Sequence, residues 1–255
     1  MGRRFIAYRT LARREIHRFV RIWPQTLLPP VVTTSLYFLI FGALMGPKIG
    51  PVAGVNYIDY IVPGIVLMAV INHSYANVVS SFFSAKFQRH IEEMLIAPMP
   101  SWVVLAGYVT AGVARGMVIG GIVLAIAALF TDLNLAHPIL AVAMAFLTSV
   151  LFSLAGLINA VFANSFDDIS IIPNFVLTPL VYLGGVFYSV AMLPEPWATV
   201  SLSNPILYMV EAFRFGFLGS ADVDVRVAFA LVGGLIALLG VGAWFVLSRG
   251  IGLKA

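Results

Sequence analysis

The chain has 255 residues, of which 61% are hydrophobic and only 10% are charged. A soluble domain has about a quarter of its residues charged, so this composition excludes an ordinary soluble protein and is typical of a protein with several membrane spans. The absence of cysteine excludes disulfides, thiol nucleophiles and cysteine-based metal sites, and the formal net charge of +4 is concentrated near the N-terminus.

Residues 1–25 predict an amphipathic helix that lies at the membrane interface. Seven of the fifteen Lys and Arg residues fall within residues 1–21. At about 100° per residue, arginines gather on one face and apolar side chains on the other, although Arg4 and Glu15 break the pattern. A nucleic-acid-binding basic helix is disfavoured by the wide apolar face, which suits a membrane surface and its lipids. That face consists of Phe5, Tyr8, Leu11, Ala12, Ile16, Phe19, Ile22 and Trp23.

Six apolar runs follow, each long enough to be a membrane-spanning helix. We therefore predict an all-α, polytopic membrane protein with six transmembrane helices in a single domain over residues 1–255. In the fifth run, prolines and a Gly-Gly pair predict a broken helix. The six runs cover about residues 27–45, 60–83, 102–130, 138–162, 169–187 and 227–247.

The distribution of basic residues predicts the orientation in the membrane. An even number of spans places both termini and segment 86–100 on one side. The positive-inside rule makes the side with more Lys and Arg the cytoplasmic one. The termini side collects the seven N-terminal arginines with Lys86, Arg89, Arg249 and Lys254, against Lys48, Arg214 and Arg226 on the other side.

No motif in the sequence supplies an energy source. The chain has no G-x-x-x-x-G-K-[ST], H-E-x-x-H or G-x-S-x-G motif. Its histidines (His17, His73, His90 and His137) lie in separate segments without metal-ligand spacing. We therefore predict that the chain is not an enzyme and holds no metal or cofactor, so that energy for any work comes from a partner or an ion gradient.

Few polar side chains fall inside the predicted spans. Asn72, His73 and Asn77 mark the middle of the second span, and His73 and Asn77 face the same way, which favours hydrogen bonds between helices. Arg115 lies inside the third span, where it either pairs with another protein group or lies along a substrate path. No carboxylate falls at a span centre, which disfavours a gradient-driven carrier.

Segment 86–100, KFQRHIEEMLIAPMP, is strongly charged and lies between two long apolar runs. Its helical spacing gives one apolar stripe, and Pro98 and Pro100 end the helix before the next span. Two interpretations stay open from periodicity alone. The segment is either an ordinary loop resting on the bilayer or a coupling helix that fits a cytosolic motor.

At this point the sequence resembles a known family. The segments KFQRHIEEMLIAPMPSWVVLAGYVTAGVARG, FDDISIIPNFVLTPLVYLGGVFYSVAMLPEPW and SNPILYMVEAFRFGFLG are similar to bacterial ABC-2 type transporter permeases, above all the small YadH-like group. With EIHRFVRIWPQTLLPP near the N-terminus, the resemblance covers nearly the whole chain. It implies a permease subunit of an ATP-driven exporter in the bacterial inner membrane, with two permease copies and two ATPase subunits that hold ATP and Mg.

The resemblance also implies roles for particular residues. Segment 86–100 becomes the coupling helix, with ATPase-docking residues Phe87, Gln88, Arg89, Ile91, Glu92, Glu93, Met94 and Leu95. Residues 188–226 become a re-entrant extracytoplasmic region with gate residues Asn204, Pro205, Tyr208, Glu211 and Arg214. Glu211 and Arg214 are three apart, so they can pair on one helix face.

Two other functions stay open beside the exporter permease. A gradient-driven carrier is the first. A membrane-embedded lipid-modifying enzyme is the second, and it needs a polar catalytic cluster at one interface. Asp167 and Asp168 are the best candidates for that cluster, but no histidine or basic partner lies near them in the sequence. The apolar spans favour an amphipathic, lipid-like, glycan or drug-like substrate.

Overall fold

Long apolar runs fold into helices because a helix satisfies its own backbone hydrogen bonds where no water is present. The computed structural model of the chain describes residues 2–91 and 99–253, and these residues contain no strand. Five helical segments are long and apolar enough to cross a membrane. They are Trp23–Ile49 (α2, η1 and α3), Tyr57–Phe87 (α4), Ser101–Ala127 (α6), Pro138–Phe162 (α7) and Val225–Arg249 (α12).

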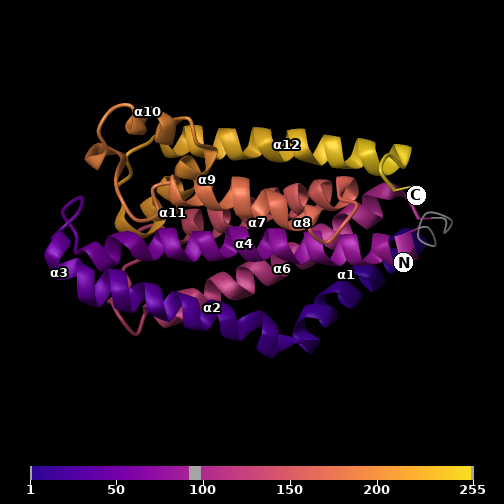
Figure 1. Ribbon diagram of the computed structural model, residues 1–255, viewed down its shortest axis with the longest axis horizontal. Coiled ribbons are helices and arrows are strands. Elements are labelled where there is room, and N and C mark those ends of the chain that lie inside the picture. Colours follow the sequence, from indigo (N-terminus) through magenta and orange to yellow (C-terminus); the bar gives the residue numbers. More distant parts are fainter. Residues whose placement is uncertain (1, 92–98, 254–255) are drawn as a thin grey trace.

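The long helices run along one axis of the molecule, and both termini lie at the same end (Figure 1). The opposite end holds α3 (Gly46–Ile49) and the short helices that precede α12. Five of the six predicted spans are confirmed as helices of spanning length, and α7 has the bounds that the sequence predicted.

The fifth predicted span, at residues 169–187, is the remaining one, and its helix is shorter than expected. Its helical run is Asp168–Tyr182, made of α8 (Asp168–Ile172), the π-helical turn η2 (Pro173–Leu177) and α9 (Thr178–Tyr182). The prolines at 173 and 179 have no N–H to donate, and the Thr178 hydroxyl donates to the Pro173 carbonyl at 2.8 Å. The helix then ends before Gly184, so it spans about 22 Å rather than the roughly 30 Å of a bilayer core.

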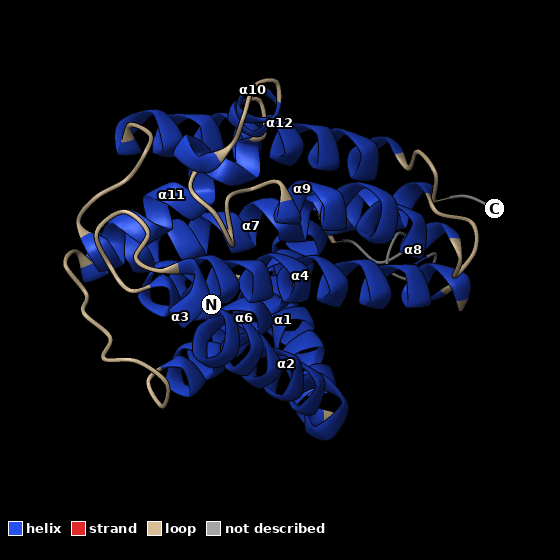
Figure 2. Ribbon diagram, turned by 60° about the vertical axis from the view of Figure 1, so that its left-hand side comes forward, coloured by secondary structure: helices blue, strands red, loops and turns tan. Residues whose placement is uncertain are grey.

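The N-terminal helix α1 (Arg3–Arg21) packs against protein as well as facing outward. It joins α2 (Trp23–Tyr37) through a bend at Ile22, and Figure 2 shows α1, α2 and α6 next to one another. The Tyr8 hydroxyl lies 2.9 Å from the Thr110 hydroxyl of α6. Part of the apolar face that we expected at the membrane interface therefore lies on α6.

Helix α4 is the central element, because α6 and α7 pack on it and nearly all of its apolar side chains are buried. The helices approach closely where glycine removes the side chain. A Cβ placed on Gly156 of α7 would lie 2.6 Å from the Tyr75 carbonyl oxygen of α4. At the same contact, Asn159 Nδ2 donates to the Tyr75 hydroxyl at 2.7 Å.

Replacing Gly156 with alanine is therefore expected to push α7 away from α4. Overpacking of this kind lowers the free energy of unfolding by about 1–3 kcal/mol. The measurement is thermal unfolding of the purified protein in detergent. Gly242→Ala on α12 is the matched control, since a Cβ there meets no atom within 4 Å. Equal unfolding temperatures for the two variants would contradict the close contact.

Residues 188–226 form three short helices at the end away from the termini (Figure 1). These are η3 (Val190–Met192), α10 (Trp197–Leu202) and α11 (Pro205–Leu218). Helix α11 is buried over most of its length and packs on α4, α7 and α12. It is thus a core element rather than a surface loop.

Candidate functional site

Polar side chains meet α4 at three levels along its length, and each level joins it to another part of the chain. We call them the lysine end (around Lys86), the arginine cluster (around Asn77) and the ion-pair clamp (around Tyr60). Since α4 is one helix of 31 residues, about 46 Å long, the three levels belong to one element.

At the lysine end, Lys86 connects the last turn of α4 to the end of α7 by hydrogen bonds. Its Nζ donates to the carbonyls of Val161 at 2.6 Å and Ala163 at 2.7 Å. A cation is favourable there because the last carbonyls of a helix carry partial negative charge. Beside Lys86, the ring of Phe87 packs on Phe83 and Phe166, with the Phe87 and Phe166 centroids 5.2 Å apart.

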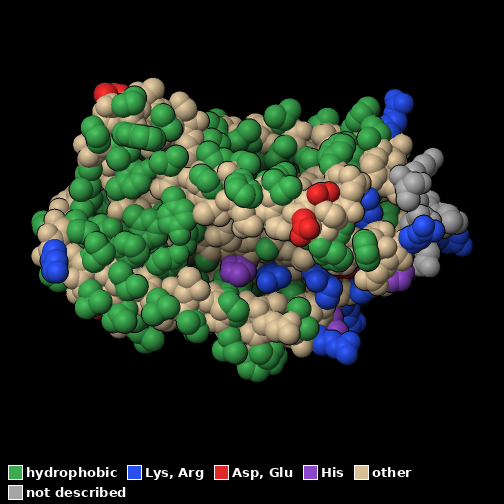
Figure 3. Space-filling model, viewed as in Figure 1, with side chains coloured by type: hydrophobic (Ala, Val, Ile, Leu, Met, Phe, Trp, Pro, Cys, Tyr) green, Lys and Arg blue, Asp and Glu red, His purple; other side chains and the backbone are tan. Residues whose placement is uncertain are grey.

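The predicted docking residues divide into three groups. Phe87, Gln88 and Arg89 are exposed, and Arg89 has a φ of +61°, so the chain leaves the axis of α4 there. Ile91 is buried and packs on the chain's own helices. Figure 3 shows Lys and Arg side chains gathered at this end of the molecule, where both termini lie. Four predicted docking residues lie outside the described residues: Glu92, Glu93, Met94 and Leu95.

Of the two candidate catalytic carboxylates, Asp167 is exposed and Asp168 organises the turn between α7 and α8. Its Oδ2 accepts from the backbone N–H groups of Asn164 at 2.8 Å and Ser165 at 3.1 Å, and its own N–H donates to the Ser165 hydroxyl. The hydrogen bonds of this carboxylate are those of a local cap.

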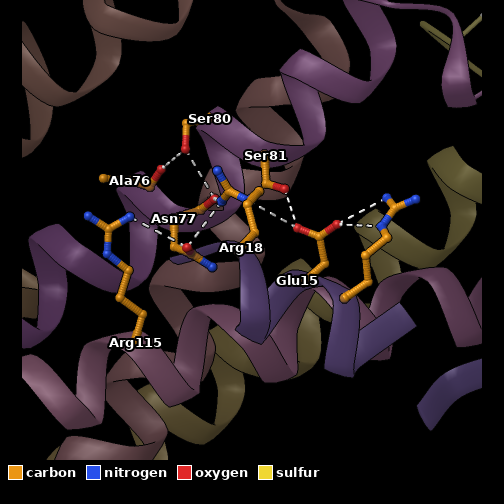
Figure 4. Close-up of polar contacts among 8 residues, drawn as sticks. Glu15, Arg18, Ala76, Asn77, Ser80, Ser81 and Arg115 are labelled. Carbon is orange, nitrogen blue, oxygen red and sulfur yellow. Dashed lines mark hydrogen bonds and ion pairs between the residues drawn. The ribbon is translucent and has the colours of Figure 1, made fainter. Parts of the chain in front are cut away.

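The arginine cluster brings α1, α4 and α6 together (Figure 4). Asn77 is buried on α4, and its Oδ1 accepts from Arg18 Nη2 at 3.2 Å and from Arg115 Nη1 at 3.5 Å. Arg18 Nη2 also donates to the Asn77 backbone carbonyl at 3.2 Å. The predicted hydrogen bonding between helices is therefore confirmed for Asn77, and the protein partner of Arg115 is this amide.

A carboxylate in the same cluster was missed by sequence reasoning. Glu15 of α1 is only 2% exposed, accepts from the Ser81 hydroxyl of α4, and pairs with Arg14 at 3.0 Å and Arg18 at 3.4 Å. The available signal was that Glu15 broke the amphipathic pattern of residues 1–25. A carboxylate on an otherwise apolar face indicates a buried polar partner.

The other polar residues of the second span do not join these contacts. His73 is half-buried, and its Nδ1 atom has no hydrogen-bond partner within the described part of the chain. Asn72 makes no side-chain hydrogen bond with residues 2–91 or 99–253. No hydrogen bond of the described residues therefore supports the predicted interhelical role of Asn72 and His73.

The ion-pair clamp confirms that Glu211 and Arg214 pair, and it buries both side chains. Arg214 Nη1 donates to Glu211 Oε1, and the two residues are each 1% exposed. Arg214 also donates to the carbonyls of Gly185 at 2.6 Å and Tyr60 at 3.2 Å, and its guanidinium lies 3.9 Å from the centre of the Tyr60 ring. Glu211 Oε2 accepts from the Asp222 backbone N–H at 2.8 Å.

The remaining predicted gate residues lie on the first two turns of α11. Asn204 caps the helix, because its Oδ1 accepts from the Ile206 N–H at 3.0 Å, and its Nδ2 donates to the Leu180 carbonyl at 2.6 Å. Pro205 occupies the first helical position, where a missing N–H costs nothing. Tyr208 is half-buried and makes no side-chain hydrogen bond with the described residues.

Within the described residues, the polar side chains of the three levels bind other parts of the chain. Over residues 2–91 and 99–253, no group of three His, Cys, Asp or Glu side chains lies close enough to hold a metal ion. The geometry suits a membrane protein in which one end of α4 meets an exposed basic segment and the other end meets the buried helix α11.

Comparison with known proteins places this arrangement among transporters. Residues 6–218 match the family described as ABC-2 type transporter. The chain is 51% identical over 251 residues to the inner membrane transport permease YadH of Escherichia coli K12, covering 98% of both chains. It is 26% identical over 206 residues to nodulation protein J of Rhizobium leguminosarum bv. trifolii, covering 78% of this chain and 77% of that protein.

Proposed function

This chain belongs to the ABC-2 type transporter family, and from that we propose that it is the membrane-spanning permease subunit of an ATP-driven exporter in the bacterial inner membrane. The observation that favours this most is the family match over residues 6–218, together with 51% identity to an inner membrane transport permease. ATP and Mg are held by a separate ATPase subunit, and two copies of each subunit form the transporter.

The proposed topology has six membrane passages with both termini in the cytoplasm. Five helices have spanning length, and five passages would leave the termini on opposite sides. Both termini lie at the same end of the bundle, so we take Asp168–Tyr182 and the turn after it as the further passage. The Lys and Arg side chains at the termini end favour the cytoplasmic side for that end.

Segment 86–100 docks on the ATPase subunit in this proposal. Its first residues, Phe87 to Arg89, are exposed at the basic end of α4. Lys86 and Phe87 connect that end to α7 and to the turn before α8. A displacement of the docked segment would therefore be transmitted to α7 and to the turn before α8 as well as to α4.

The test is reconstitution of the purified chain in proteoliposomes, with and without its ATPase subunit, while efflux of an amphipathic fluorescent dye is followed. We expect efflux only when the ATPase and ATP are both present. Efflux driven by an ion gradient without the ATPase would replace the proposal with a carrier. Chemical modification of lipid by the chain alone would favour the membrane-embedded enzyme.

Replacing Lys86 with methionine is expected to separate ATP hydrolysis from transport. The ATPase should still bind, but transport per ATP hydrolysed should fall about tenfold, because a hydrogen bond from a charged group contributes about 1.5–3 kcal/mol. The measurement is the ratio of dye efflux to phosphate release in proteoliposomes. Lys48→Met, at the opposite end, is the control. An unchanged ratio of dye efflux to phosphate release would show that Lys86 does not couple ATP hydrolysis to transport.

A further inference from the structure

The arginine cluster holds more positive charge than its described partners neutralise. Arg18 and Arg115 both donate to Asn77 Oδ1, which is a neutral amide oxygen. Glu15 pairs with Arg14 and Arg18. No carboxylate within residues 2–91 and 99–253 forms an ion pair with Arg115. Among these residues, the guanidinium of Arg115 therefore has no negative partner.

That guanidinium lies about midway along a membrane-spanning helix. Arg115 is near the middle of α6, about 20 Å from each end of the helix. A charge at this depth is costly and is normally paired or faces a water-filled path. Burial next to a second arginine adds repulsion between like charges. An anion at this position would offset both effects.

The cluster also has nitrogen atoms left for a ligand. Arg115 Nε and His73 Nδ1 are buried and have no hydrogen-bond partner among the described residues, whereas Arg18 Nε lies 3.4 Å from Glu15 Oε2. Figure 4 shows the guanidinium groups of Arg18 and Arg115 directed toward Asn77 from α1 and α6. The guanidinium of Arg115, which uses only Nη1 for Asn77, can present a planar pair of donors to an oxyanion, and Arg18 adds its positive charge.

The cluster is accessible from the side of the bundle. Arg115 and His73 are half-buried, the side chain of Arg18 is 35% exposed, and Ala76 beside them is exposed. Figure 3 shows a histidine and Lys or Arg side chains in a row along α4, with hydrophobic surface further to the left and below. The nearby helix α2 exposes apolar side chains such as Leu28, Val32 and Leu36. A ligand here would meet cations and hydrocarbon together.

We propose that Arg18, Arg115 and His73 bind the anionic headgroup, a phosphate or carboxylate, of an amphiphile whose apolar chains remain in the membrane. The binding site is inferred from the charges and contacts described above. Its use as a transport site rests on the proposed exporter function. The headgroup accepts from both guanidiniums and replaces the missing partner of Arg115. This makes the substrate class an anionic amphiphile.

The first test uses the unaltered full chain in a neutral detergent. A fluorescent short-chain phosphatidic acid is bound, and dihexanoyl phosphatidic acid, dihexanoyl glycerol and inorganic phosphate are compared as competitors. We expect phosphatidic acid to displace the probe at a concentration at least about tenfold lower than dihexanoyl glycerol, which lacks the charged headgroup. Equal competition by the uncharged lipid would overturn the proposal. Inorganic phosphate as effective as phosphatidic acid would assign the site to a free anion and overturn the amphiphile.

The second test locates the site. Arg115→Gln should weaken binding of the phosphatidic acid probe about tenfold, and Arg115→Lys, which keeps the charge without the planar fork, should weaken it less. Arg9→Gln on the exposed side of α1 is the matched control and should leave binding unchanged. Unchanged binding in Arg115→Gln would overturn the assignment. Binding is measured without ATPase or ATP, so a failure of ATP-driven efflux and a failure of this site are distinguishable.

Discussion

Replacing Arg214 with methionine is expected to lower the free energy of unfolding by about 3–5 kcal/mol. The change removes hydrogen bonds to the carbonyls of Gly185 and Tyr60 and leaves the Glu211 carboxylate buried without its cation. A buried charge that loses its partner costs more than the pair contributes. Thermal unfolding of the purified protein in detergent measures the effect.

A second variant separates the lost charge balance from lost packing. In the double variant Glu211→Gln with Arg214→Met, no unpaired charge remains, so we expect part of the stability to return. Arg226→Met is the matched control, because Arg226 is an exposed arginine at the same end of the molecule. If the double variant is no more stable than Arg214→Met alone, the unpaired charge of Glu211 is not what lowers the free energy of unfolding. The loss would then come from the packing of the Arg214 side chain.

Replacing both Glu92 and Glu93 with alanine is expected to reduce binding of the ATPase subunit by about tenfold or more, and transport with it. In the proposed docking role the two carboxylates meet basic groups on the partner, and losing one partner of a buried charge pair at an interface costs about 2–5 kcal/mol. Copurification of the ATPase with the permease, followed by dye efflux, measures both effects.

The control for this change is Glu195→Ala, which removes an exposed carboxylate next to α10, at the opposite end of the bundle. Its ATPase binding should match that of the unaltered chain. Undiminished binding in the Glu92 and Glu93 variant would remove the pair from the docking surface. This variant and Lys86→Met are expected to differ, since one loses the partner and the other retains it without transport.

The sequence predicted those features that depend on local pattern. Apolar length identified five of the spans, and a spacing of three identified the pair of Glu211 and Arg214. The predicted span extended to residue 187, but the helix ends at Tyr182, before Gly184. Pro173 does not end the helix, because it lies in a π-helical turn. Residue types alone do not tell whether a proline ends a helix or changes its hydrogen bonding.

The contacts that could not be predicted are those between distant segments. Helical periodicity gave α1 an apolar face, but it does not specify that the face lies on α6, nor that Glu15 reaches Ser81. The carbonyl partners of Arg214 and Lys86 belong to backbone, which every residue has, so no residue type identifies them. Only the packing of the helices determines which carbonyls face these cations.

The three polar levels on α4 have a thermodynamic consequence. The proposed anion site and the proposed docking segment both act on one continuous helix of 31 residues. If an anion at Arg115 tightens ATPase binding by some factor, linkage requires that the ATPase tighten anion binding by the same factor. Binding of the anion and binding of the ATPase subunit would then depend on each other, although the two ligands do not touch.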